Sequence, residues 1–355
     1  MPKSNNKSLS INKGSDVNDS VNPNYRAKKL SKRSLKEYVE GVKNGDRTIL
    51  SQAITLIESS KNEYREFGQQ ILEECLPETG NSIRIGVTGV PGVGKSTFIE
   101  ALGQYIIQNN HKLAVLTIDP SSSRSKGSIL GDKTRMQKLS TDDRAFIRPS
   151  PTSGTLGGVA QKTRETMLLC EAAGYDIIFI ETVGVGQSET TVHSMVDFFL
   201  LLMLAGAGDE LQGIKRGIME MADLIAINKA EGDNIKASKR AKREYENALS
   251  LFPPSPSGWK PKVLTCSALQ TIGIEEIWSE VQQYLSLTSK NGFFEKRRKE
   301  QAAYWMYETI NRELKQKFYS DPVVKEKLTK FEKDVQTGKI SSFKAAKDLL
   351  ELFDR

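Results

Sequence analysis

Residues 83–98 contain the side chains whose types and spacing point most directly to chemistry. The stretch opens with an apolar, β-branched run that is typical of a buried strand. It continues as Gly89-x-x-x-x-Gly94-Lys95-Ser96, and apolar residues at helical spacing follow. A strand, this glycine pattern and a helix, in that order, form the complete context of a phosphate-binding loop. The sequence therefore predicts a site for nucleotide phosphates.

Each residue type of this loop has a physical reason. The glycines let the backbone turn tightly, so that consecutive N–H groups point at phosphate oxygens. The helix that begins near Lys95 adds the positive end of its dipole. We expect Lys95 to contact the β- and γ-phosphates and Ser96 to offer its hydroxyl to Mg²⁺. The residues expected to bind nucleotide here are Gly89, Val90, Pro91, Gly92, Val93, Gly94, Lys95, Ser96 and Thr97.

Composition narrows the class of protein. Of the 355 residues, 38% are hydrophobic and 27% are charged, which describes a sizeable core under a heavily charged surface. The net charge is +7, and its concentration at the two ends favours solvated helices and a basic tail over a nucleic-acid partner. Three scattered cysteines and two histidines predict neither a disulfide framework nor a zinc site, and they fit a reducing compartment. For His193 a structural role is favoured over nucleotide sensing.

Targeting signals are also informative. Residues 1–24 are polar throughout, so no secretory signal opens the chain. The longest apolar run, 196–208, is too short to span a bilayer and suits a buried central strand. We therefore expect a cytoplasmic protein with neither a nucleic-acid nor a membrane partner.

The patterning divides the chain into four regions. They are a disordered leader (1–30), a helical N-terminal extension (31–80), a domain of alternating strands and helices (81–289) and a helical C-terminal arm (290–355). Strands are expected at 83–88, 113–118, 177–180, 198–204, 224–228 and 263–266. The alternation predicts an α/β fold with a doubly wound, mostly parallel sheet. In such sheets ligands bind at the carboxyl ends of the strands.

Acidic residues follow two of these strands. Asp119 comes after the second strand, where it is placed to help hold Mg²⁺ and its waters. Glu181 follows the third strand, and Gly184 comes three residues later, which is the usual layout of a switch. The acid then orients Mg²⁺ through water, and the glycine N–H senses the γ-phosphate. Asp132 and Arg135 lie in a long Ser- and Gly-rich loop and either reach back to the nucleotide or form an exposed ion pair.

A glycine-rich segment follows the apolar fourth strand and carries Asp209, Gln212 and Lys215. An acid, an amide and a base in such a segment fit another switch or a partner contact. A simple loop fits as well.

The segment Asn228-Lys229-x-Glu231 follows the fifth strand and is close to the Asn-Lys-x-Asp of guanine-specific enzymes. There the Asn reads the purine edge, and the carboxylate accepts from the ring N–H and exocyclic amine that adenine lacks. Because Glu is one methylene longer than Asp, the loop shifts to fit it, discrimination suffers, or Asp233 substitutes. A short loop after the sixth strand resembles the one that closes on guanine, and its residues are Ser267, Ala268 and Leu269.

The C-terminal arm reads as three helices, with an apolar stripe on the first. The stripe comprises Ala302, Trp305, Met306, Thr309, Ile310 and Leu314. An extended arm buries such a stripe against its own domain or against a second copy of the chain. We favour a dimer contact.

Taken together, these motifs resemble the GTPase chaperones associated with methylmalonyl-CoA mutase, in the signal-recognition and metal-chaperone branch of P-loop GTPases. The motifs that carry the resemblance are residues 89–97, 119–122, 127–136, 181–189, 207–215 and 228–230. The resemblance implies a homodimeric, Mg²⁺-dependent GTPase that binds an adenosylcobalamin-dependent acyl-CoA mutase. Such proteins couple GTP hydrolysis to cofactor loading and to protection of the mutase. The sequence departs from the family pattern at Glu231, where the family has Asp.

The resemblance also implies roles for individual residues. Lys95 and Ser96 would bind phosphate and Mg²⁺, and Asp119, Asp132 and Glu181 would surround the metal. Asp209, Gln212 and Lys215 would form a third switch that responds to the mutase. The candidate catalytic residues are Lys95, Asp132, Arg135 and Lys215. No strong general base or arginine finger stands out, so we expect slow intrinsic turnover that a partner stimulates.

Three alternatives stay open at this point. One is a nickel-type metallochaperone GTPase, although the chain has few histidines and cysteines to hold such a metal. Another is a kinase linked to transport of basic amino acids, which an ATP/GTP competition would distinguish. The last is a nucleic-acid-binding GTPase built on the basic ends.

Overall fold

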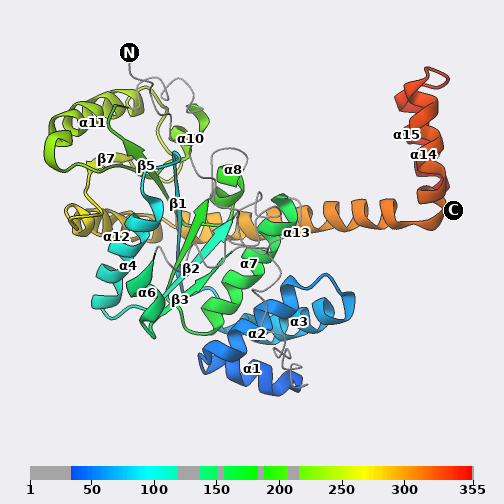
Figure 1. Ribbon diagram of the computed structural model, residues 1–355, viewed down its shortest axis with the longest axis horizontal. Coiled ribbons are helices and arrows are strands. Elements are labelled where there is room, and N and C mark those ends of the chain that lie inside the picture. The colour runs from blue at the N-terminus through cyan, green and yellow to red at the C-terminus, as the bar shows by residue number, and fades with distance from the viewer. Residues whose placement is uncertain (1–32, 119–135, 150–155, 183–187, 207–215, 354–355) are drawn as a thin grey trace, which may run out of the picture. The chain divides into compact units, whose positions relative to one another are not determined.

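A seven-stranded sheet forms the centre of the molecule, and each neighbouring pair of its strands is parallel (Figure 1). The computed structural model describes residues 33–118, 136–149, 156–182, 188–206 and 216–353. The strands are β1 (Ile83–Gly89), β2 (Leu113–Ile118), β3 (Ala145–Arg148), β4 (Ile177–Thr182), β5 (Phe198–Leu204), β6 (Leu224–Asn228) and β7 (Lys262–Thr265). Their order is β3-β2-β4-β1-β5-β6-β7. The predicted α/β class with a doubly wound sheet is confirmed.

Helices connect the strands and cover both faces of the sheet. They are α4 (Lys95–Gln108), α6 (Gln137–Thr141), α7 (Leu156–Ala172), α8 (Ser188–His193), α10 (Arg216–Met221), α11 (Ile235–Leu249) and α12 (Ile274–Lys290). Side chains alternate along β2: Leu113 and Val115 join one core with α4 and α12, and Ala114 and Leu116 join the other with α7. The two cores fix the register of the strands and therefore bring all carboxyl ends to one edge.

One strand was not predicted from the sequence. β3 has four residues, pairs only with β2 and lies at the edge of the sheet. Its short apolar run ends at Arg148, whose guanidinium pairs with Glu58 of the N-terminal extension. A strand this short carries too little alternation to be distinguished from a loop.

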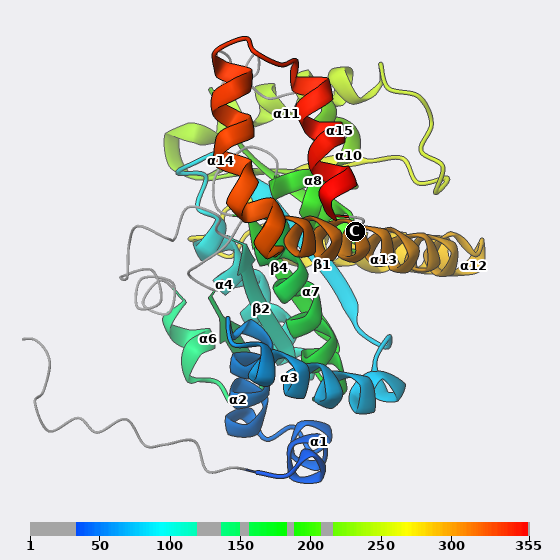
Figure 2. The ribbon, with the colours of Figure 1, turned by 90° about the vertical axis from the view of Figure 1, so that its right-hand side faces the viewer.

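Three helices precede the sheet and pack on the face that α7 covers (Figure 2). They are α1 (Leu35–Lys43), α2 (Arg47–Glu58) and α3 (Asn62–Cys75). The Asp46 side chain accepts hydrogen bonds from the N–H groups of Thr48 and Ile49, which fixes the start of α2. The predicted leader, residues 1–30, lies outside the described residues.

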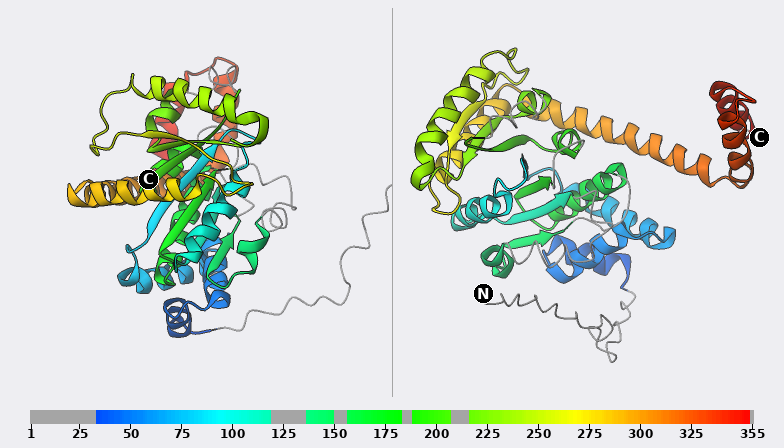
Figure 3. Two further views of the ribbon diagram at one scale, coloured as in Figure 1. Left: turned by 90° about the vertical axis from the view of Figure 1, so that its left-hand side faces the viewer. Right: turned by 45° about the horizontal axis from the view of Figure 1, so that its top comes forward.

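The C-terminal helices are α13 (Phe293–Ser320), α14 (Pro322–Gln336) and α15 (Ser342–Phe353). The first turns of α13 lie against the α/β body, and α14 and α15 pack on each other at its far end (Figure 3). Trp305 is buried, whereas Met306, Ile310 and Leu314 of the predicted stripe are about half exposed. Within the stripe, Trp305 is thus the side chain that packs on the body, where its Nε1 donates to the Ser194 carbonyl. No helix in the described part of the chain is long and apolar enough to cross a membrane.

A buried ion network attaches α13 to the amino ends of the central strands. The guanidinium of Arg298 donates to both carboxylate oxygens of Asp197, at 2.8 and 2.6 Å. The same guanidinium donates to the carbonyls of Gly80 and Ser82, just before β1. The N–H of Arg84 in β1 donates to Asp197 as well, at 2.9 Å. Because the Asp197 side chain is 1% exposed, its charge depends on these partners.

We predict that Arg298→Met destabilises the protein by about 3–5 kcal/mol, because it leaves the Asp197 carboxylate buried without its cation. Urea unfolding followed by circular dichroism measures the free energy of unfolding. The matched control is Lys299→Met, which removes an exposed cation one residue further along α13 and changes stability by no more than about 0.5 kcal/mol. Equal stability of the two variants would contradict the importance of this network.

Candidate active site

The phosphate loop lies at the carboxyl end of β1, in the middle of the sheet, and runs directly into α4. At Gly89 φ is +154°, and a Cβ there would lie 2.4 Å from the carbonyl oxygen of Leu202 on β5. Only glycine allows this approach of the two strands. Since α4 begins at Lys95, its unpaired N–H groups and positive dipole end lie at the loop. The loop therefore has the geometry of an anion-binding site.

The Lys95 side chain folds back over its own loop. Its Nζ donates to the carbonyl oxygen of Gly89 at 2.9 Å. Burial lowers the pKa of the Lys95 ammonium, while the carboxylates of Glu181 and Glu189 oppose that effect. Both carboxylates are themselves buried. The loop thus holds a cation at the place where phosphate charge would collect.

Two of the predicted metal-binding groups lie next to each other. The Ser96 hydroxyl donates to Oε1 of Glu181 at 3.5 Å. Glu181 lies in β4, directly between Val87 of β1 and Thr117 of β2 in the strand register. Hydroxyl and carboxylate oxygens are the hard ligands that Mg²⁺ prefers, so these two groups fit one side of a magnesium site. Among the residues that the structure describes, no group of three or more His, Cys, Asp and Glu side chains forms a metal cluster.

Several predicted site residues lie outside the described residues, and their roles stay predictions. They are Asp119, Asp132, Arg135, Gly184, Asp209, Gln212 and Lys215.

Asn228, at the end of β6, connects the phosphate loop to the loop after β7. Its Nδ2 donates to the carbonyl oxygen of Val93 at 2.8 Å. Its Oδ1 accepts from the N–H of Ala268 at 3.0 Å and from the thiol of Cys266 at 3.6 Å. The side chain is buried, and both ends of its amide are bonded within the protein. The structure therefore gives Asn228 the position of a brace between two loops, and its predicted contact with the purine edge stays a prediction.

Lys229 and Glu231 follow on the same loop. Lys229 has a φ of +61°, and its Nζ donates to the carbonyl oxygen of Gly92 at 2.8 Å, so its stem lies along the phosphate loop. Oε2 of Glu231 is buried and has no hydrogen-bond partner among the described residues. Asp233, the predicted substitute, is exposed. An unpaired carboxylate oxygen is costly to bury, and a donor pair such as the guanine N–H groups would satisfy it.

The loop after β7 has a fixed shape. Ser267 and Ile272 exchange two backbone hydrogen bonds, and the Ser267 hydroxyl accepts from the N–H of Gln270 at 3.1 Å. Ser267 and Ala268 are buried, whereas Leu269 is 77% exposed. The predicted residues of this loop thus lie beside Asn228, and the Leu269 side chain is directed to solvent.

The sequence pattern assigned no role to Glu189, which is fully buried in α8 and acts on the Lys95 ammonium. Glu189 is the last residue of the 181–189 motif. Its polar sequence neighbours do not indicate that this carboxylate is buried. Only the packing of α8 under the sheet places this side chain near the phosphate loop.

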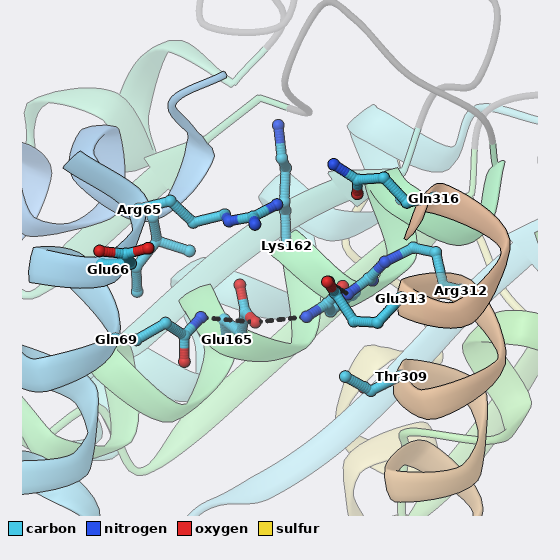
Figure 4. Close-up of a pocket in the computed structure, with 12 residues that line it drawn as sticks. Arg65, Glu66, Gln69, Lys162, Glu165, Thr309, Arg312, Glu313 and Gln316 are labelled. Carbon is cyan, nitrogen blue, oxygen red and sulfur yellow. Dashed lines mark hydrogen bonds and ion pairs between the residues drawn. The ribbon is translucent and has the colours of Figure 1, made fainter. Parts of the chain in front are cut away.

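A separate cavity of about 630 Å³ lies between α3, α7 and α13, and no residue of the phosphate loop lines it (Figure 4). Arg65 and Arg312 extend into it from opposite sides. Burial raises the pKa of Glu165 at its base, and the amides of Gln69 and Gln161 donate to that carboxyl at 2.8 and 2.7 Å. The cavity is lined by both acidic and basic side chains, and some of them pair with one another. These charges therefore do not indicate which class of ligand the cavity would bind.

Comparison with known proteins gives a consistent result. The family model described as methylmalonyl-CoA mutase-associated GTPase MeaB matches residues 50–323. A probable GTPase of Mycobacterium tuberculosis is 49% identical over 311 residues, covering 88% of this chain and 93% of the relative. GTPase ArgK of Escherichia coli is 48% identical over 285 residues, covering 80% and 86%.

Two further matches extend this result. The mitochondrial methylmalonic aciduria type A homologue of Mus musculus is 46% identical over 323 residues, covering 88% of this chain and 78% of the relative. The crystal structure of a protein named LAO/AO transport system kinase superposes with a TM-score of 0.74 at 37% identity, covering 92% of this chain and 99% of that one.

We predict that Asn228→Ala weakens both the fold and nucleotide binding. It leaves the Ala268 N–H and the Val93 carbonyl without their partner, at about 1–3 kcal/mol for each buried group. Calorimetric titration with GDP and urea unfolding measure the two effects. Asn247→Ala, at an exposed position of α11, is the matched control. If Asn228→Ala behaved like that control in both measurements, the bracing role would be wrong.

Proposed function

The chain belongs to the family of methylmalonyl-CoA mutase-associated GTPases, and from this premise we propose that it is a chaperone of an adenosylcobalamin-dependent acyl-CoA mutase. It is a GTPase, and in this proposal hydrolysis is coupled to loading of the mutase cofactor and to protection of the mutase. The family description, which names association with that mutase, supports the choice of partner. Three buried free cysteines support a place in the reducing cytoplasm.

The observation that carries the nucleotide assignment is the convergence of three loops on one edge of the sheet. The buried amide of Asn228 bonds to both the phosphate loop and the Ser267 loop there. The Lys229 ammonium and the Ala230 N–H add bonds from the same segment to Gly92 and Cys266. In the proposed complex the backbone from Gly92 to Thr97 binds the phosphates, and Glu231 accepts from guanine. Ser96 and Glu181 would hold Mg²⁺, which supplies charge neutralisation at the phosphates.

We assign hydrolysis to electrostatic stabilisation more than to proton transfer. Lys95 provides the cation that stabilises charge developing on the γ-phosphate. Of the described side chains at the loop, the carboxylates of Glu181 and Glu189 interact with the Lys95 ammonium, so we assign neither of them the role of general base. In this proposal a partner that contacts the segments of Gly184, Asp209, Gln212 and Lys215 raises a slow intrinsic rate.

The same proposal includes a homodimer formed through the arm. Met306, Ile310 and Leu314 recur every fourth residue on α13 and are 51%, 46% and 53% exposed. Phe343 of α15 is 87% exposed. An apolar surface of this kind is more typical of an interface than of a solvated helix, and a second copy of the arm would cover it.

We predict that the purified protein hydrolyses GTP slowly and that an adenosylcobalamin-dependent acyl-CoA mutase from the same organism accelerates it. Phosphate release is measured with and without the mutase, and with ATP in parallel. Lys95→Ala lowers turnover by roughly 10²-fold or more, whereas Lys112→Ala, an exposed lysine at the opposite edge of the sheet, leaves it unchanged.

The outcomes separate the candidate functions. GTP turnover that no such mutase changes would contradict the chaperone proposal and keep the GTPase. Preference for ATP would instead favour the kinase alternative, an activity that the name of one solved relative gives to that relative.

A further inference from the structure

We propose that α8 and the linker that follows it, residues 194–197, transmit the state of the phosphate site to the arm helix α13. Arg297 is the positioning residue of this connection. The inference rests on nucleotide binding at the phosphate loop and is independent of the mutase partner.

The first end of α8 lies at the phosphate site. Glu189, in its first turn, is fully buried and favours the charged form of the Lys95 ammonium. In this structure that ammonium is bonded to the Gly89 carbonyl. Bound phosphate oxygens would compete with the Gly89 carbonyl for the Lys95 ammonium. The electrostatic potential at the Glu189 carboxylate would therefore change when nucleotide binds.

The last turn of α8 and the linker after it pack directly on β1. A Cβ added to Gly86 would lie 2.9 Å from Val192, 3.1 Å from Val196 and 2.8 Å from Phe199. No side chain therefore separates α8 and its linker from the strand that carries the phosphate loop. Close-packed contacts of this kind transmit displacement, because they have no free volume in which to absorb it.

The other end of α8 is bonded to the arm helix. Arg297 Nη2 donates to Nε2 of His193 at 3.0 Å. Trp305 Nε1 donates to the Ser194 carbonyl at 3.2 Å, and Gln301 Nε2 donates to the Val196 carbonyl at 2.8 Å. Residues 297, 301 and 305 are four apart, so a single face of α13 contacts the end of α8 and this linker.

The chemistry of His193 fits this connection. Burial, together with Arg297, lowers the pKa of His193 to about 4. The imidazole is therefore neutral at physiological pH, and its Nε2 is free to accept from the guanidinium. Arg297 also donates to the Tyr284 hydroxyl of α12 at 3.2 Å. Its guanidinium is therefore hydrogen-bonded to α12 as well as to His193.

The consequence is a connection only six residues long between two sites. A six-residue helix spans about 9 Å, with Lys95 acting on one end and Arg297 on the other. A shift of α8 with nucleotide state must either carry α13 along or break the Arg297–His193 hydrogen bond. By linkage, the position of the arm then alters nucleotide affinity by the same factor.

Hydrogen exchange of the full-length protein tests this connection. Peptides covering residues 293–306 are followed without nucleotide, with Mg·GDP and with a non-hydrolysable Mg·GTP analogue. We expect the two nucleotides to give exchange rates in this segment that differ by about fivefold or more. Arg297→Met should abolish that difference while both nucleotides still bind, as measured separately by calorimetry. Lys299→Met, exposed on the same helix, should keep it.

Each outcome decides the matter. Nucleotide binding without any response in 293–306, or an unchanged response in Arg297→Met, would overturn this inference and leave the proposed function intact. Absence of nucleotide binding would overturn both. If Arg297→Met did not fold, Arg297→Lys, which keeps the charge and loses the fork, and Gln301→Leu would replace it under the same criteria.

Discussion

The buried amide of Asn228 is the interaction on which the candidate site depends. It donates to Val93 of the phosphate loop and accepts from Ala268 of the loop after β7. Two further hydrogen bonds from the same segment support this connection: the Lys229 ammonium donates to Gly92, and the Ala230 N–H donates to Cys266. The Asn228 amide thus holds the phosphate loop and the loop after β7 next to each other. Among the described carboxylates of these loops, Glu231 has a buried oxygen without a hydrogen-bond partner. A donor from a ligand is the natural partner for that oxygen.

The parallel sheet makes this convergence geometrically necessary. Because β1, β4, β5, β6 and β7 run in the same direction, the segments that follow them begin at one edge. At the opposite edge the same arrangement collects the amino ends, where Arg298 and Asp197 attach α13 to the body. The carboxyl edge therefore carries the candidate nucleotide site, and the amino edge carries the attachment of α13. The short helix α8 interacts with Lys95 at one end and with Arg297 at the other.

Much of this could be predicted from the sequence, because its signals are local. The strand before Gly89, the glycine spacing and the helix after Lys95 lie within one continuous stretch, and the structure has all three. Residues 198–204 of the long apolar run form β5, an interior strand of the sheet, as the composition of the run indicates. The arm helices were predicted from their periodicity and from Pro322, which begins α14.

What the sequence could not supply are contacts between distant residues. β3 is too short for its alternation to be recognised, and only pairing with β2 defines it. The burial of Glu189 follows from the packing of α8 under the sheet, and the Asn228 amide finds partners 135 and 40 residues away. His193 was expected to be structural, and its bond to Arg297, 104 residues further on, depends on where α13 lies.

We propose that a preformed site recognises guanine with Glu231 in the place of the usual Asp. Competitive binding of GDP, IDP and ADP with Mg²⁺ tests it most directly, since IDP keeps the ring N–H and lacks the exocyclic amine. We predict that GDP binds most tightly, that IDP is intermediate, and that ADP is weaker than GDP by about tenfold or more. ADP binding as tight as GDP binding would contradict it, because the carboxylate would then read nothing on the base.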